Sequence, residues 1–199
     1  MDEEAALRER LLSTAIDVFS LKGYAAANLT DITNALNVSR GPIYYHFKDK
    51  YGLFKATFDA WESSIRTSHG KIIAQTGVPI LTILGQTIYN CLGLCRKFKP
   101  NYFVGLETIG DLDELKLRYH ALVSDIYQAK ILAVEAAMER GELGRALSPK
   151  IIVDTVYILY DGVRVGLERS TDPLDPAEVE PLVELELSVL GAKASGRVG

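Results

Sequence analysis

The chain has few of the residues that cross-link a fold or break helices, since its 199 residues include only 2 cysteines, 16 glycines and 7 prolines. So few cysteines exclude the disulfide-rich scaffolds of small secreted domains. The chain begins Met-Asp-Glu-Glu, which lacks the positive charge with which a signal peptide starts. We therefore expect a cytoplasmic protein. With 48% hydrophobic residues, the composition excludes intrinsic disorder and suffices for one or two packed cores.

A purely apolar run of membrane-spanning length is also missing. The longest stretch without a charged residue covers residues 72–95, which is long enough to span a bilayer. It contains polar side chains, among them Gln75, Gln86 and Asn90, which are costly in hydrocarbon. We therefore predict a helix buried within protein and no membrane partner.

Strand patterns are equally scarce, because no segment alternates apolar and polar residues for long enough to form a convincing β-strand. Apolar residues recur at helical spacing along almost the whole chain, which predicts an all-α fold. Gly23 is placed to end a first helix, and caps at Asn28, Ser39 and Asp49 predict three more. Later helices are expected at about residues 79–97, 101–109, 111–140, 148–169 and 175–191.

The segment of residues 28–47 carries most of the functional information. Its first short helix begins after Asn28, where Asp31 completes a capping box, and stops near Asn37, which can adopt a left-handed turn. The second helix follows Ser39 and runs to the end of the segment. Two short helices joined by so short a turn are typical of a helix-turn-helix motif, whose second helix enters the DNA major groove.

The net charge of −4 does not exclude a nucleic-acid partner, because phosphate contacts need only a local basic patch. Such a patch is present between residues 40 and 55, which contain four basic residues and one acidic residue. They are Arg40, Lys48, Lys50 and Lys55 against Asp49. We expect this stretch to contact phosphates. The negative net charge predicts only modest non-specific binding to nucleic acid.

The second short helix has two different sides when its residues are placed at about 100° intervals. Ile43 and Phe47 fall on one side, which faces the core. Polar and aromatic residues fall on the other side, within about 140°, and are Arg40, Gly41, Tyr44, Tyr45 and Lys48. A guanidinium can bond guanine edges, a glycine permits close approach, and phenols reach phosphates or thymine methyl groups. The first-turn N–H groups, together with Ser39, suit a phosphate.

These residues resemble the amino-terminal domain of TetR-family transcriptional regulators. The resemblance covers about residues 8–62 and is carried by Gly23-Tyr24, Leu29-Thr-Asp-Ile32 and Val38-Ser-Arg-Gly-Pro-Ile-Tyr-Tyr-His-Phe-Lys-Asp-Lys50. It implies a homodimer that places two recognition helices in successive major grooves of a palindromic, double-stranded operator and usually represses. It also implies release by a small-molecule ligand.

The resemblance implies roles for single residues by position. Asn28 and Thr30 would contact phosphates, and Arg40 and Gly41 would contact bases. The DNA backbone would be contacted by Tyr44, Tyr45, His46 and Lys50. The chain departs from the usual pattern at Ile32-Thr33, Leu36-Asn37 and Lys50-Tyr51. We therefore predict a helix-turn-helix DNA-binding domain over residues 1–66, a helical ligand-binding and dimerisation domain over 67–191, and a loose tail over 192–199.

Aromatic and polar residues that could line an apolar ligand cavity are concentrated in the larger domain and at its border. The candidates are Trp61, Tyr89, Asn90, Tyr102, Phe103, Glu107, Tyr127 and Tyr160. The alternative is that these side chains form ordinary core.

The last two expected helices could form a two-fold, four-helix dimer interface, as in the family. Small and apolar residues suited to it are Gly162, Gly166, Val179, Leu182, Val183 and Leu187. The alternative is that both helices pack within one subunit.

Signals of catalysis are missing. No nucleophile has a base at plausible spacing, and neither a pair of metal ligands nor a phosphate-binding glycine loop is present, so we expect no enzyme, cofactor or metal. Cys91 and Cys95 share one helical face, and packing is the favoured reading over a redox role. A helical ligand-binding or interaction module without DNA contact is the remaining alternative, although the basic stretch argues against it.

Overall fold

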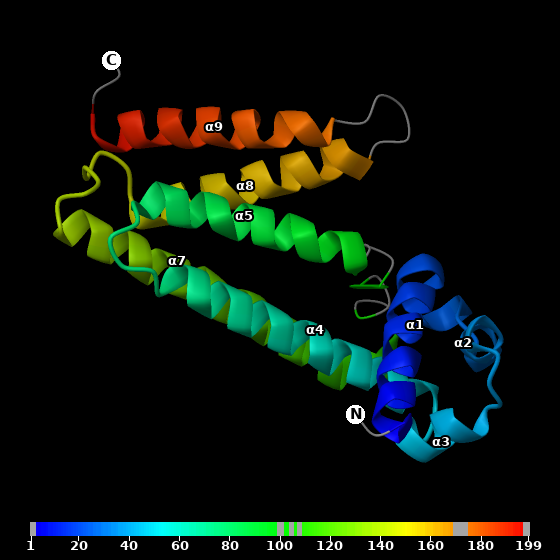
Figure 1. Cartoon of the computed structure of the whole chain (residues 1–199). Helices are drawn as coiled ribbons and strands as arrows, with labels where there is room; N and C mark the ends of the chain where they lie inside the picture. Colours follow the sequence, from blue (N-terminus) through cyan, green and yellow to red (C-terminus); the bar gives the residue numbers. More distant parts are fainter. Residues whose placement is uncertain (1–2, 99–101, 104–105, 107–108, 169–174, 197–199) are drawn as a thin grey trace. The chain divides into compact units, whose positions relative to one another are not determined.

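The computed structural model describes residues 3–98, 102–103, 106, 109–168 and 175–196, and these residues form helices and connecting turns without a β-strand. The all-α prediction is confirmed. The helices, labelled in Figure 1, are α1 (Glu3–Ala26), α2 (Leu29–Leu36), α3 (Gly41–Phe47), α4 (Lys50–Ile73), α5 (Ile80–Lys97), η1 (Gly110–Leu112), α7 (Asp113–Glu139), α8 (Pro149–Glu168), η2 (Pro176–Glu178) and α9 (Val179–Ala194). Most of the helix expected at 101–109 lies outside the described residues.

The chain divides into two compact units. The first unit consists of Met1–Arg66 and Gly93–Leu122, and the second of Thr67–Leu92 and Val123–Gly199. Helices α4, α5 and α7 therefore each contribute residues to both units. Among the residues that the structure describes, no helix is long and apolar enough to cross a membrane.

The first unit has a core in which the two short helices are seated on α1 and α4. Ile32 of α2 and Ile43 of α3 are completely buried. On the α4 side, the ring of Phe54 packs edge-on against Phe19 of α1 at a centroid distance of 5.0 Å. Burying aromatic and branched side chains of this size contributes about 1.5–3 kcal/mol each, which holds α2 and α3 in place.

Several local signals in the sequence act as predicted. Gly23 has φ 72° and interrupts α1, as expected for a glycine that ends a helix. The Asn28 N–H donates to the Asp31 carboxylate at 2.9 Å, which caps α2. The Gly52 N–H donates to the Asp49 carboxylate at 2.7 Å, which caps α4.

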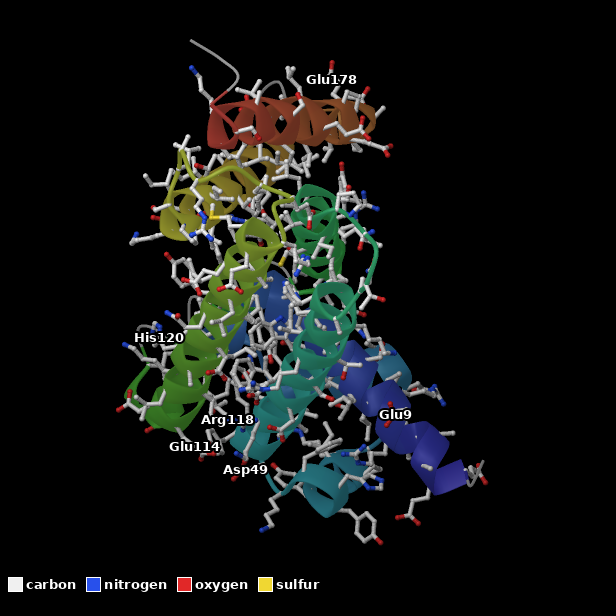
Figure 2. The ribbon with its side chains drawn as sticks, turned by 90° about the vertical axis from the view of Figure 1, so that its left-hand side faces the viewer. Glu9, Asp49, Glu114, Arg118, His120 and Glu178 are labelled. Carbon is white, nitrogen blue, oxygen red and sulfur yellow. The ribbon has the colours of Figure 1, made fainter. Side chains whose placement is uncertain are left out.

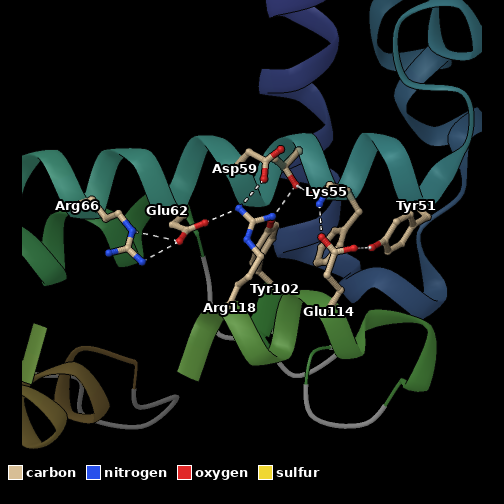
Figure 3. Close-up of polar contacts among 10 residues, drawn as sticks. Tyr51, Lys55, Asp59, Glu62, Arg66, Tyr102, Glu114 and Arg118 are labelled. Atoms are coloured by element: carbon tan, nitrogen blue, oxygen red, sulfur yellow. Dashed lines mark hydrogen bonds and ion pairs between the residues drawn. The ribbon is translucent and has the colours of Figure 1, made fainter. Parts of the chain in front are cut away.

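A row of ionic contacts joins α4 to α7 within the first unit (Figure 3). Arg118 of α7 bridges Asp59, at 2.7 Å, and Glu62 of α4. One turn earlier on α7, Glu114 accepts from Lys55 and from the Tyr51 hydroxyl. Glu114 and Arg118 lie near the end of α4 that Asp49 caps (Figure 2). Exposed pairs contribute only about 0.2–1 kcal/mol each, so their main effect is to set the register of the two helices.

One carboxylate of this row is held ionised by its partners. Burial alone would raise the pKa of Glu62, but hydrogen bonds from Arg118 and Arg66 outweigh burial and lower it. The contribution of Glu62 to stability is therefore present at neutral pH and is lost as the pH falls through the lowered pKa.

The second unit is closed by α9, which packs on α8 (Figure 1). Val179, Val183 and Leu187 of α9 point into the core of their own chain, and Gly166 of α8 is also buried. This corrects their assignment to a dimer interface, because side chains buried within one subunit cannot meet a second copy. The prediction that these residues of α9 share one helical face was right, but that face is turned toward the core of its own subunit.

The last helix also extends beyond its expected end at Gly191. It continues to Ala194, which is completely buried, and the carbonyl of Ala194 accepts from the Ala146 N–H at 3.1 Å. The start of the predicted loose tail is therefore ordered, because α9 continues to Ala194 and Ala194 is packed against the loop that precedes α8.

Candidate nucleic-acid interface

The recognition helix α3 presents two chemically different faces, as the sequence predicts. Ile43 and Phe47 are buried, whereas Tyr44 is 50% and Tyr45 75% exposed. Arg40, Gly41 and Lys48 are exposed as well, and His46 is half-buried. Two phenols left in water on so short a helix have no role in the core of this chain. The outer face of α3 is therefore available to a partner.

The turn between α2 and α3 has the predicted left-handed residue. Asn37 adopts φ 53° and ψ 47°, a conformation that asparagine tolerates better than most residues. After the turn, α3 begins one residue later than expected, with Arg40 instead of Ser39 at the N-cap position and no side-chain cap bond. The Arg40 guanidinium donates to the Thr30 hydroxyl of α2. This hydrogen bond ties the two helices together at the outer face.

Lys48, directly after α3, has a strained backbone. Its φ of 71° and ψ of −54° are those of a γ-turn, which the Asp49 N–H closes by donating to the Phe47 carbonyl at 2.9 Å. Such a conformation costs about 1–3 kcal/mol for a residue with a Cβ atom. The turn directs the chain from α3 into α4 and leaves the Lys48 side chain exposed.

Lys48→Gly is expected to stabilise the fold while weakening DNA binding. Glycine relieves the strain, and after its own entropic cost we expect about 1 kcal/mol more free energy of unfolding, measured by urea denaturation. Operator affinity falls because the ammonium is lost. Lys48→Ala is the matched control, since it removes the charge and keeps the strained backbone. Equal stability of the two variants would contradict this account.

Gly52 is a positioning residue that the sequence reading missed. A Cβ atom added there would lie 1.9 Å from the Phe47 carbonyl oxygen. The first turn of α4 therefore approaches the end of α3 as closely as only glycine allows. A glycine in the first turn of a helix, three residues after its cap, is the signal that could have revealed this contact.

One predicted DNA contact, Lys50, is tied to another part of the first unit. The Lys50 ammonium donates to the Ala25 carbonyl at 3.2 Å and lies 4.6 Å from the centre of the Tyr24 ring. Burial lowers the pKa of Lys50. Lys50 therefore fastens the last residues of α1, after the break at Gly23, as well as carrying charge. Asn28 and Thr30 lie at the start of α2, where Asn28 is exposed.

An acidic edge beside α3 was also not anticipated. Glu3 and Glu4 of α1 line a surface hollow of about 550 Å³ together with Pro42, Tyr45 and His46. Both carboxylates are exposed, and charges act over about 8 Å in physiological salt. They would repel a phosphate backbone placed against this edge.

Glu3→Gln and Glu4→Gln together are expected to tighten operator binding about threefold, because two repulsions with phosphates are removed. The gain should shrink as salt is raised, and fluorescence anisotropy with labelled operator measures it. Glu9→Gln is the control, since Glu9, labelled in Figure 2, is an exposed acidic residue of α1 that does not line this hollow. An equal gain from Glu9→Gln would indicate a general charge effect.

The predicted pocket residues divide between the two units. In the first unit, Trp61 packs edge-on against Phe103 at a centroid distance of 5.1 Å and stacks with Tyr119 at 5.7 Å. Tyr102 is completely buried, and its hydroxyl lies 2.7 Å from that of Thr57.

In the second unit, the candidates have separate partners. The Tyr127 hydroxyl donates to Asp154 at 2.8 Å, Tyr89 donates to the Glu180 carbonyl at 3.4 Å, and Asn90 contacts His69. Tyr160 is half-buried, and Glu107 lies outside the described residues. In the part of the chain that is described, no group of three His, Cys, Asp or Glu could hold a metal ion.

The short helix pair, its exposed basic and phenolic face and its capped turn define a helix-turn-helix DNA-binding protein. Residues 11–57 match the family described as bacterial regulatory proteins, tetR family. The transcriptional regulator AcrR of Shigella flexneri is 40% identical over 63 residues, which are 32% of this chain and 29% of that protein. The first unit thus carries a tetR-family DNA-binding domain, and the chain is a DNA-binding transcriptional regulator.

Longer similarities extend through both units. The transcriptional repressor DhaR of Mycobacterium sp. (strain GP1) is 24% identical over 176 residues, which cover 85% of this chain and 87% of that protein. A TetR transcriptional regulator from Chloroflexus aurantiacus has the same fold, with a TM-score of 0.69, 18% identity and 96% of each chain covered. The arrangement of helices is thus shared well beyond the DNA-binding segment.

Proposed function

We propose that the chain represses transcription as a homodimer that binds a palindromic operator and is released from it by a small organic ligand. The observation that carries this proposal is the outer face of α3, where Tyr44 and Tyr45 are exposed beside Arg40 and Lys48. Several relatives, including DhaR, are repressors by name. A repressor acts on the chromosome, so the proposed location is the cytoplasm.

In the proposed complex, α3 lies in the major groove. Arg40 bonds base edges while Gly41 lets the backbone approach, and the two tyrosines and His46 contact sugar and phosphate. Ser39, Asn28 and Thr30 add phosphate contacts around the helix starts, and Lys48 adds a charge at the far end. Lys50 acts mainly through Ala25, by positioning the segment that precedes α2.

The proposed dimer uses the outer faces of α8 and α9. Exposed apolar residues recur there at intervals of three, four and seven, which places them in one stripe on each helix. They are Ile151, Ile158 and Val165 on α8 with Leu182, Leu185 and Val189 on α9. Gly162 lies in the α8 stripe and is exposed, so a second helix could approach closely. Stripes of this kind on adjacent helices are typical of oligomer interfaces.

Ligand release is proposed to act through α4, which begins beside α3 and contributes to both compact units. A ligand that prefers a different position of α4 changes the separation of the two recognition helices. That separation must match one turn of DNA, about 34–36 Å. A hundredfold loss of operator affinity requires about 2.7 kcal/mol of coupling.

Selection of operators from random-sequence DNA by the purified protein tests the proposal. We expect recovery of a palindrome with half-sites about 10 base pairs apart, bound with an affinity that falls steeply with salt. Recovery of no preferred sequence, with weak binding that does not depend on salt, would favour the interaction module without DNA contact.

A further inference from the structure

A buried polar cluster in the second unit brings four helices together. His69 comes from the end of α4, Asn90 and Cys91 from α5, Lys130 from α7 and Tyr157 from α8. His69 and Lys130 are each only 4% exposed, whereas Cys91 is half-buried. Along the chain, Cys91 has no charged residue and no histidine within four positions. The fold supplies both, from positions far away in the chain.

The hydrogen bonds determine which nitrogen of His69 carries the proton. The Asn90 amide donates to His69 Nδ1 at 3.0 Å, so Nδ1 is an acceptor and the proton is on Nε2. The Nε2 atom lies 3.6 Å from Cys91 Sγ, toward which it donates. The Nε2 proton of His69 is therefore directed at the Cys91 sulfur.

Lys130 adds a cation that its surroundings do not neutralise. The ammonium lies 4.5 Å from the centre of the Tyr157 ring, a cation–π contact that burial strengthens. Burial lowers the pKa of Lys130, and within the described residues the group that opposes this shift is the Cys91 thiol and no carboxylate. Burying an ammonium costs several kcal/mol unless an anion pairs with it. The cluster thus has an excess of positive character.

We infer that this cluster is an anion site, in which Lys130 binds the carboxylate of an otherwise apolar ligand. This inference rests on the proposed ligand-responsive function and specifies the chemical class of the ligand. The surrounding core is apolar, with Leu92, Val134 and Val153 buried in the same unit, so the remainder of the ligand meets hydrocarbon. A carboxylate supplies the charge that the ammonium lacks, and it leaves the apolar walls to bind the rest.

Alkylation of Cys91 reports on this site without DNA and without knowledge of the natural ligand. Iodoacetate and iodoacetamide react alike: the Cys91 thiolate attacks the methylene carbon, the C–S bond forms, and iodide leaves with the electrons of the C–I bond. The two reagents differ in carrying a carboxylate or a neutral amide. In a Cys95→Ser background Cys91 is the one thiol, and mass spectrometry gives the rate with each reagent.

The ratio of the iodoacetate rate to the iodoacetamide rate is expected to fall at least tenfold in Lys130→Met. In Lys130→Arg, which keeps the positive charge, the ratio should stay close to that of the parent protein. Lys71→Met is the matched control, because it removes an exposed lysine charge of the same unit and should leave the ratio unchanged. If Lys130→Met fails to fold, Lys130→Gln takes its place. Circular dichroism checks both variants.

A ratio within twofold of the parent in the neutral variants would overturn the anion site. A fall of the same size in Lys71→Met would overturn it as well, because the effect would then belong to the overall charge. Neither result depends on operator binding. A failure of the proposed function, seen as the absence of a preferred DNA sequence, is therefore distinguishable from a failure of this inference.

Discussion

Leu185→Glu is expected to convert the protein from a dimer into monomers. Leu185 is 60% exposed in the single chain, so glutamate there does not disturb the fold of one subunit. In the proposed dimer the same position is buried, and the two-fold axis buries two uncompensated carboxylates at once. We expect the dimer dissociation constant to rise at least about a thousandfold, or roughly 4 kcal/mol. Sedimentation velocity over a range of protein concentrations measures it.

A matched control separates the interface from a general loss of surface hydrophobicity. Leu117 on α7 is 72% exposed and lies outside the two stripes, so Leu117→Glu makes the same chemical change elsewhere. It should leave the dimer intact. Leu185→Glu should also lose operator binding, because a monomer reaches only one half-site. A Leu185→Glu protein that stays dimeric at micromolar concentration would show that α9 does not form the interface.

Arg40→Ala is expected to weaken binding to the selected operator by about 1–3 kcal/mol and to relax the base preference. The reason is that a guanidinium on the exposed face of α3 can bond a guanine edge through two N–H groups, which alanine cannot. Binding to unrelated DNA should fall much less. Lys48→Ala should instead weaken all sequences alike and reduce the salt slope by about one. Anisotropy titrations on both DNAs at several salt concentrations separate the two patterns.

Arg40 also has a structural contact, which needs its own control. Its guanidinium donates to the Thr30 hydroxyl, so Arg40→Ala removes a bond between α2 and α3 as well as a group that reads bases. Thr30→Val removes this bond and keeps the guanidinium. It should retain base preference even if affinity falls through loss of the Thr30 hydroxyl. If Thr30→Val relaxes the preference as much as Arg40→Ala, the arginine acts by positioning α3.

The ion pairs between α4 and α7 bear on how a ligand could move α4. Arg118 of α7 pairs with two carboxylates of α4 within the first unit, and the later residues of α4 belong to the second unit. A ligand that moves α4 must therefore act against, or together with, these contacts. Because exposed ion pairs are worth little individually, they can set a preferred position of α4 without preventing its movement.

Local features of the first unit were predictable from the sequence. The cap of α2, the left-handed Asn37, the break at Gly23 and the inward side of α3 each depend on residues within a few positions of one another. Capping bonds and helical periodicity act over that range, so the residue types suffice. The closeness of Gly52 to Phe47 is also local, but it depends on the angle between two helices, which no pattern of residue types specifies.

The chain's own amino acids thus determined an all-α fold, the helix-turn-helix pair and the chemistry of its outer face. Only tertiary structure decided which side of α9 is buried, since an apolar helix offers several faces and its neighbours choose among them. It alone brought His69 and Lys130 to Cys91, from 22 residues before it and 39 after it. Contacts between residues so distant in the chain follow from how whole helices pack. That packing is set by the sum of many weak apolar contacts, and not by any short motif.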